Sequence, residues 1–210
     1  MKEYKIYQIS YKETYPWLKH KHYAKRIPSI SYSFGLFKGN ILVGVITFGL
    51  PSSHDLCLFL GEKYKNNFLE LNRLCVNDGL VKNSLSFFVS QSLRMISRPK
   101  VIVSYADTEQ NHCGYIYQAT NWIYTGLTKK QYDLKIKGTN KHSRHVYDNK
   151  KLETEKVNRT QKHRYFMFLG NKKEKKEMLD LLPVKILPYP KTINKRYDTN
   201  FEPQTQQILF

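Results

Sequence analysis

"FLELNRLCVNDGLVKNSLSFFVSQSLRMISRPKVIVSYAD", residues 68–107, contains two apolar stretches on either side of an amphipathic one. The middle stretch predicts a helix over 84–96, because its apolar side chains recur with the period of one helix face. Pro99 prevents that helix from continuing. The short unbroken run at 101–106 is typical of a central strand, and 68–76 predicts a strand with polar groups on one face. A strand, a helix and a second strand in succession favour an α/β fold.

Further strands and a short helix are predicted on both sides of this unit. Before it, a hairpin is expected with strands at 34–37 and 41–48, because the turn between them is Lys-Gly-Asn. After it, the expected elements are a helix at 114–119 and strands at 121–126 and 142–148. This order predicts an α/β (α+β) fold with a central mixed β-sheet flanked by helices.

The C-terminal part of the chain is strongly basic. Between residues 149 and 196 there are 14 Lys and Arg residues against 5 Asp and Glu. One apolar strand, "RYFMFLG" at 164–170, lies within this stretch. We therefore predict a core at 1–148 and a basic extension at 149–210 that packs on the core through this strand and ends in a mobile tail.

The net charge of the whole chain points to a polyanionic partner. The 210 residues carry a formal charge of +18, from 35 Lys and Arg against 17 Asp and Glu. Nucleic acid is the commonest polyanion that such a surplus attracts. The alternative is a lysine-rich composition or an accessory basic tail with no specific partner.

Neither the cysteines nor the apolar runs indicate secretion or a membrane. Cys57, Cys75 and Cys113 are odd in number and include no CxxC pair, so reduced thiols in a cytosolic protein are expected. The N-terminus lacks an apolar signal segment. The longest apolar runs, near 41–50 and 101–105, are too short to span a bilayer.

Two stretches place polar groups just beyond predicted strands, where ligands collect in α/β sheets. The first is the turn at 77–84, where Lys82 and Ser84 accompany the free N–H groups of a helix start. These groups suit an anion such as a diphosphate. The alternative is that Asn83 or Ser84 caps the helix and binds nothing.

The second stretch follows the central strand. Asp107 and Asn111 are followed by Tyr115, Tyr117 and Tyr124. A carboxylate there suits a general base, and a tyrosine suits an acid or a hydrogen-bond donor. The alternative is that Asp107 only caps the short helix after the strand.

A third stretch, "KHYAKRIP", mixes cations with an aromatic ring. Lys21, Lys25 and Arg26 surround Tyr23, a composition that is used to hold a nucleic acid strand. The histidine pairs at 20/22 and 142/145 match no closed metal site, and such pairs in basic runs are more often solvated.

Five blocks of the sequence resemble the Mom family of bacteriophage DNA-modification proteins, a divergent branch of the GNAT acyltransferase-like fold. The blocks are "HYAKRIP" (22–28), "FGLFKGNILVGVITFGLP" (34–51), "LELNRLCVND" (69–78), "VSYADTEQNHCGYIYQATNWIYTG" (103–126) and "LPYPK" (187–191). The resemblance covers roughly His22 to Tyr147, together with the last block. It implies a GNAT-like arrangement of the predicted sheet.

The resemblance also implies a function. Mom proteins convert adenine in double-stranded DNA to N6-(carbamoylmethyl)adenine, which protects phage DNA from host restriction in the cytoplasm of the infected cell. It further implies that acetyl-CoA binds at the helix start, near Arg73, Lys82, Asn83 and Ser84. The glycine-rich loop usual at that place is reduced here to Gly79.

The residues implied as catalytic are Asp107, Tyr117, His22 and Tyr23. Asp107 would accept the N6 proton, and the other tyrosines and Asn111 would hold a base flipped out of the duplex. Acyl transfer alone gives an amide on N6, whereas carbamoylmethyl is joined to N6 through CH₂. A further donor, or a redox iron ion bound through His22, is therefore expected.

Two other functions fit the sequence less closely. A GNAT-type N-acetyltransferase for a protein or a small amine predicts an acidic or neutral acceptor groove, which the charge of +18 disfavours. A non-enzymatic basic nucleic-acid-binding protein predicts that Asp107 and Tyr117 are dispensable.

Overall fold

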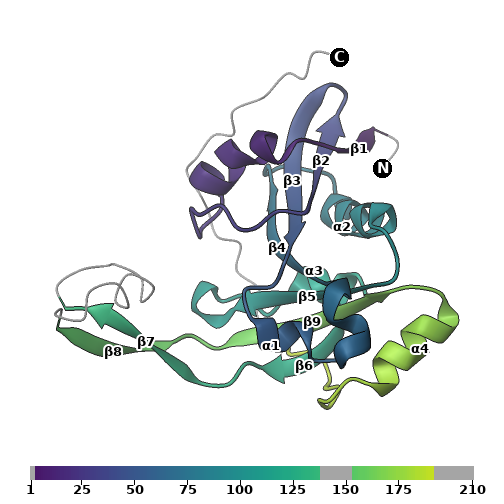
Figure 1. The fold of residues 1–210 in the computed structure, drawn as a ribbon. Helices are drawn as coiled ribbons and strands as arrows, with labels where there is room; N and C mark the ends of the chain where they lie inside the picture. Colours follow the sequence, from purple (N-terminus) through teal and green to yellow (C-terminus); the bar gives the residue numbers. More distant parts are fainter. Residues whose placement is uncertain (1–2, 138–152, 192–210) are drawn as a thin grey trace.

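The computed structural model describes residues 3–137 and 153–191, and seven of its strands form one mixed sheet. In spatial order the strands are β1 (Tyr4–Gln8), β2 (Tyr32–Lys38), β3 (Ile41–Gly49), β4 (Phe68–Val76), β5 (Lys100–Asp107), β9 (Lys162–Leu169) and β6 (Ile123–Leu127). Neighbours are antiparallel except β4 and β5, which are parallel. The predicted mixed sheet with flanking helices is therefore confirmed (Figure 1).

Helices cover both faces of the sheet, because successive strand residues point to opposite faces. On one face, α2 (Ser84–Met95) and α3 (Tyr115–Ala119) pack on the largest apolar cluster. On the other, α1 (His54–Cys57), the short helix η3 (Glu62–Asn67) and α4 (Lys172–Asp180) cover a second cluster. Two short N-terminal helices are η1 (Tyr11–Thr14) and η2 (Trp17–Lys21), and η2 contributes to a third cluster.

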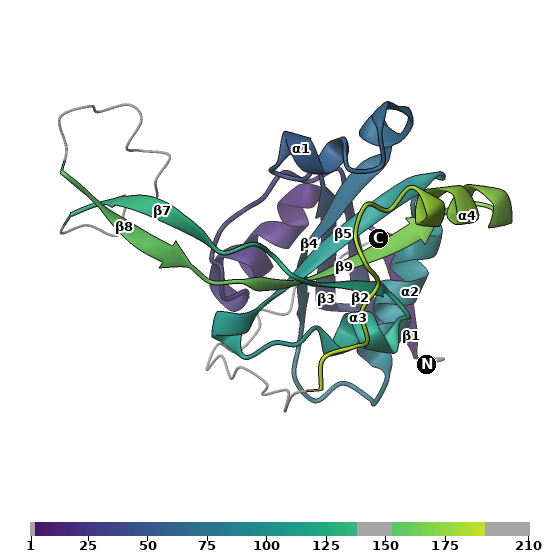
Figure 2. The same cartoon turned by 90° about the horizontal axis from the view of Figure 1, so that it is seen from below.

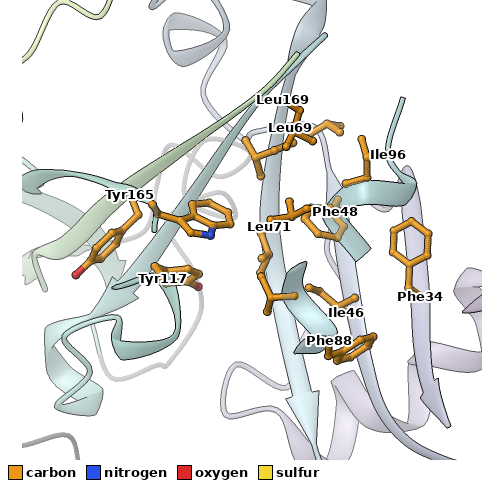
Figure 3. Close-up of a cluster of buried hydrophobic side chains, with 14 of the residues drawn as sticks. Phe34, Ile46, Phe48, Leu69, Leu71, Phe88, Ile96, Tyr117, Tyr165 and Leu169 are labelled. Carbon is orange, nitrogen blue, oxygen red and sulfur yellow. The ribbon is translucent and has the colours of Figure 1, made fainter. Parts of the chain in front are cut away.

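The largest cluster spans the middle of the sheet. Figure 3 shows Phe34, Phe48 and Phe88 on one side of Leu71, and Tyr117 and Tyr165 on the other. The same apolar cluster therefore contacts both halves of the sheet, β1–β4 and the half that contains β5, β9 and β6.

Most predicted elements within residues 34–126 are confirmed. These include the hairpin β2–β3, the strands β4, β5 and β6, and the helices α2 and α3. The predicted strand at 142–148 lies outside the described residues. The sequence reasoning missed β1, α4 and a second hairpin.

That second hairpin consists of β7 (Gln131–Ile136) and β8 (Thr154–Arg159), which pair with each other in a separate two-stranded sheet. Figures 1 and 2 show it extending away from the main sheet, and we call β7 and β8 the arm. The arm begins after β6 and returns into β9, so its base lies beside the end of β5.

The apolar strand predicted within the basic extension is β9, and it lies between β5 and β6. Eight of its residues pair with β5, from Lys162 opposite Asp107 to Leu169 opposite Lys100. This strand is thus part of the central sheet itself. The division of the chain at residue 148 stays a prediction, because that boundary and the tail after 191 lie outside the described residues.

The parallel strands β4 and β5 separate before they end. Their pairing is confined to Phe68–Glu70 with Val101–Val103, while β4 continues to Val76 and β5 to Asp107. Beyond the last pair, the carboxyl ends of the two strands diverge. This is the place in an α/β sheet where a ligand site is expected.

Within the described ranges, no helix is both long and apolar enough to span a bilayer. The three cysteines form no disulfide, and Cys75 and Cys113 are buried.

Candidate active site

A cavity of about 670 Å³ lies where β4 and β5 diverge. Its walls come from the end of η2 and the following turn, from β4 and its loop into α2, from the end of β5, and from α3. A volume of this size is typical of small-ligand sites in proteins. Segments that are far apart in the sequence therefore meet at one opening.

Ten of the residues predicted from the sequence line this cavity. They are Lys21, His22, Tyr23, Arg73, Lys82, Asn83, Ser84, Asp107, Tyr115 and Tyr117. Four of the predicted residues are not among its lining: Lys25, Arg26, Asn111 and Tyr124. Glu70, Tyr105, His112 and Lys162 also line it and were missed.

Asp107 both caps a helix and faces the cavity. Its Oδ1 accepts hydrogen bonds from the Glu109 N–H at 3.1 Å and from the Thr160 hydroxyl at 2.9 Å. Its Oδ2 pairs with Lys162 Nζ at 3.3 Å. The capping role is therefore observed, while the role of Asp107 as a general base stays a prediction. Its carboxylate is held by Thr160 and Lys162, at the base of the arm.

Tyr117 is buried and lines the cavity. Its hydroxyl lies 2.7 Å from Ser104 Oγ, and its ring packs on Trp122 and Tyr165. Burial raises the pKa of Tyr117 far above its usual range, although the Ser104 hydrogen bond lowers it. Tyr117 is therefore a neutral hydrogen-bonding group with a fixed ring.

Close packing at Gly114, the residue just before α3, holds the Tyr117 ring in place. Gly114 has φ +79°, and a Cβ atom there would come within 2.5 Å of the Tyr165 ring. Only glycine fits both that backbone conformation and that space. Tyr165 Oη in turn donates to the Cys113 carbonyl.

His22 and Tyr23 form a stacked pair at the cavity wall, with ring centroids 4.4 Å apart. His22 is buried, and its Nδ1 accepts a hydrogen bond from the Ala24 N–H at 3.1 Å. Burial, together with the nearby charges of Arg73 and His112, lowers the pKa of His22 to about 3. His22 is thus a neutral imidazole whose proton is on Nε2.

The loop from β4 to α2 forms another wall. Asn83 precedes the helix in the left-handed conformation without a side-chain cap, and Ser84 is buried. Lys21 also lies here, with its ammonium buried and without a hydrogen bond in the described part of the chain. Its ion pair with Asp78 Oδ2 measures 3.6 Å. Cationic and N–H groups therefore converge on this side of the cavity.

Arg73 joins this wall to the basic N-terminal stretch. Its Nε donates to the Arg26 carbonyl at 3.3 Å, and its Nη1 donates to the Asn72 carbonyl at 2.6 Å. Burial lowers the pKa of Arg73, but the guanidinium remains charged.

The four predicted residues outside the cavity have other positions. Asn111 ends a short helix with φ 53°, and Lys25 adopts φ 44° in the turn after His22. Tyr124 is buried, with its hydroxyl 2.7 Å from His163 Nδ1. Tyr124 therefore supports the aromatic cluster rather than the cavity surface.

The predicted iron site is not supported by a ligand set. In residues 3–137 and 153–191, no three His, Cys, Asp or Glu side chains are grouped so as to hold a metal ion. His22 has its Nδ1 engaged by a backbone N–H. These donors do not fit an iron ion, and no reaction step is assigned to one.

Comparison with known proteins gives a family match and a curated relative. The model of the Mom protein family matches residues 3–191. "Methylcarbamoylase mom" of Escherichia phage Mu is 31% identical over 190 residues, which cover 81% of this chain and 77% of that protein.

Solved structures of acetyltransferases are also similar. A GNAT family acetyltransferase from Elizabethkingia anophelis with acetyl-CoA bound is 11% identical, with a TM-score of 0.45 over 80% of this chain and 100% of that one. An N-acetyltransferase from Staphylococcus aureus Mu50 is 11% identical, with a TM-score of 0.47 over 80% and 99% of the two chains.

Proposed function

This chain belongs to the Mom protein family, and on that premise we propose that it is a transferase that modifies adenine N6 in phage DNA. The proposed product is N6-(carbamoylmethyl)adenine, made in the cytoplasm of the infected host to block restriction. The observation that carries the proposal is the cavity between β4 and β5. It gathers Asp107, Tyr117, His22 and Tyr23 with the loop that precedes α2.

The aromatic wall of the cavity supports a base as the acceptor. An enzyme that acts on a base in a duplex rotates it out of the stack and holds it against aromatic groups. Tyr23, Tyr105 and Tyr117 supply such surfaces here. Neutral His22 supplies an Nε2–H donor for a ring nitrogen. We propose that the flipped adenine binds on this wall.

A second group of lining residues supports a donor that carries phosphate. Lys21, Arg73 and Lys82 are cationic, and the α2 N-terminus adds its N–H groups. These residues fit the diphosphate of acetyl-CoA, which when bound supplies an activated acyl carbon. Lys21, which was predicted to contact DNA, is proposed here to contact the donor instead.

The carbamoylmethyl product restricts the chemistry of the donor. Attack at a thioester carbonyl leaves an amide on N6, whereas carbamoylmethyl requires a new bond from N6 to a CH₂ carbon. The donor, or a later step, must therefore provide that methylene. The chain's own residues have the same tasks in either case: to hold the base, to exclude water and to remove a proton.

Double-stranded DNA is the proposed partner. The arm and the exposed lysines of α4 lie on the surface, and the base of the arm meets Asp107 through Thr160 and Lys162. Cations at these places would hold the phosphates while one base enters the cavity.

Mass spectrometry of nucleosides tests the proposed function. Plasmid DNA would be isolated from cells that express this protein and from cells that express the empty vector. We expect a new adenosine adduct with the mass of the carbamoylmethyl product. An acetylated adenosine would identify a different transferase, and unmodified DNA would contradict the proposal.

A further inference from the structure

We propose that Glu70 accepts the proton from the attacking amine, while the Asp107 carboxylate, held by its hydrogen bonds and by Lys162, positions groups at the cavity. This inference rests on the proposed function and adds a catalytic residue to it. Glu70 belongs to β4 and was not singled out in the sequence.

The position of Glu70 follows from the sheet. It forms the last β4–β5 pair, opposite Val103, at the point where the two strands part. Its neighbours Leu69 and Leu71 face the α2 side in the largest apolar cluster, so Glu70 points to the other face. There it lines the cavity together with Tyr105.

The carboxylates that line the cavity differ in their partners. Asp78 is exposed and pairs with Lys21. Asp107 accepts two hydrogen bonds and pairs with Lys162. Glu70 is half-buried and has no hydrogen bond or ion pair within the described residues. A carboxylate without donors keeps its lone pairs for a substrate proton.

The surroundings of Glu70 also affect its strength as a base. Burial raises the pKa of Glu70, and the positive charges of Arg73 and Lys162 oppose that rise. The other titratable groups that interact with it are Tyr105 of β5, Tyr117 of α3 and Tyr23. A raised pKa makes a carboxylate a stronger base than an exposed one. Carboxylates in unlike environments commonly take unlike roles.

The proposed proton transfer accompanies attack of the amine on a carbon electrophile. The only other reagent is that electrophile, which carries a group that leaves as an anion. The amine nitrogen bonds to that carbon, and the bond to the leaving group breaks with its electron pair. The N–H bond breaks toward nitrogen, and the proton bonds to a Glu70 oxygen. Glu70 becomes neutral as the leaving group takes the negative charge.

The test compares three single variants by the rate at which modified adenine accumulates in plasmid DNA after induction. Glu70→Gln keeps shape but cannot accept the proton, so we expect a loss of about a hundredfold or more. Asp107→Asn keeps the helix cap and loses only the charge, so its loss should be smaller. The matched control is Glu109→Gln, an exposed residue beside Asp107, which should retain wild-type activity.

A second readout does not depend on activity. The side-chain carboxyl of Glu70 would be followed by ¹³C NMR during a pH titration and assigned by its absence in Glu70→Gln. We expect it to titrate at a higher pH than an ordinary glutamate carboxyl, because burial raises the pKa of Glu70. Melting temperature and DNA affinity would show that Glu70→Gln is folded and binds DNA.

The outcomes separate the two proposals. Wild-type protein that leaves adenine unmodified overturns the proposed function. Wild-type activity with an equally active, folded Glu70→Gln overturns the Glu70 assignment alone. A hundredfold loss in Asp107→Asn with little loss in Glu70→Gln would instead assign the proton to Asp107.

Discussion

At the scale of single residues, Tyr117 combines a packing role with a proposed chemical one. Its ring contacts Trp122 and Tyr165, and its hydroxyl meets Ser104 Oγ, which also donates to the Leu71 carbonyl. Removing only the hydroxyl therefore leaves the ring packing intact and Ser104 with a partner. A change of Tyr117 to Phe therefore tests the role of the hydroxyl while the packing of the ring is kept.

We predict that Tyr117→Phe lowers the free energy of unfolding by about 1 kcal/mol, the usual value of one hydrogen bond. If the hydroxyl contacts the base or the donor, adenine modification should fall at least tenfold. Urea unfolding and nucleoside mass spectrometry measure the two effects. Tyr11→Phe, at an exposed tyrosine, is the control. Full activity in a stable Tyr117→Phe protein would leave Tyr117 with packing alone.

His22 predicts a pH dependence of stability. Its pKa is lowered from 6.5 to about 3 in the folded chain, so the unfolded chain binds the proton first as pH falls. The stabilisation is complete above pH 6.5 and is lost as pH falls from there toward 3. Each pH unit in that window changes the free energy of unfolding by up to about 1.4 kcal/mol.

The measurement compares urea unfolding of wild type and His22→Gln between pH 4 and 7. His163, with its lowered pKa, contributes in the same direction, and Glu70, with its raised pKa, contributes in the opposite one. The difference between the two proteins isolates His22. His20→Gln, at an exposed histidine, should keep the wild-type slope. Equal slopes in wild type and His22→Gln would contradict a buried neutral imidazole.

At the scale of elements, the end of η2 places a cation against the loop before α2. Lys21 Nζ is buried and makes no hydrogen bond within the described residues. A buried ammonium with incomplete partners costs stability unless a ligand meets it. The position of Lys21 therefore fits a ligand-binding residue better than a stabilising one.

We predict that Lys21→Met keeps or raises the melting temperature, because the stem is retained and the buried charge is removed. The rise in melting temperature on adding coenzyme A should be lost. Differential scanning fluorimetry with and without coenzyme A measures both effects. Lys19→Met, on the exposed side of the same helix, is the control. An unchanged response to coenzyme A in Lys21→Met would remove Lys21 from the donor site.

The elements that sequence reasoning found are those with a clear apolar pattern, such as α2 and β5. It missed α4, "KKEKKEMLD", because Met178 is its one fully buried side chain and no apolar stripe appears. It missed Glu70 as a site residue, because a polar residue between Leu69 and Leu71 looks like an ordinary outer strand position. Only the divergence of β4 from β5 gives Glu70 a cavity to face.

At the scale of the whole molecule, part of the positive charge lies on the projecting arm. The arm leaves the sheet beside Asp107, and exposed cations lie at its base and along it. Three of these are Lys129, Lys130 and Lys156. Figure 2 shows the arm extending away from the main sheet. DNA that follows the arm would be led to the end of β5, where Asp107 lines the cavity.

DNA affinity should therefore depend steeply on salt, because each phosphate contact releases counterions and adds about 0.9 to the slope of log K against log salt. We predict that changing Lys129, Lys130 and Lys156 together to Gln weakens binding and lowers that slope by up to about 3. Fluorescence anisotropy with a duplex at several salt concentrations provides the slopes. A Lys5→Gln variant, at an exposed lysine of β1, the edge strand at the other side of the sheet from β6, should change them little. A wild-type affinity that is flat in salt would contradict phosphate-led binding, and an unchanged slope in the triple variant would place the DNA away from the arm.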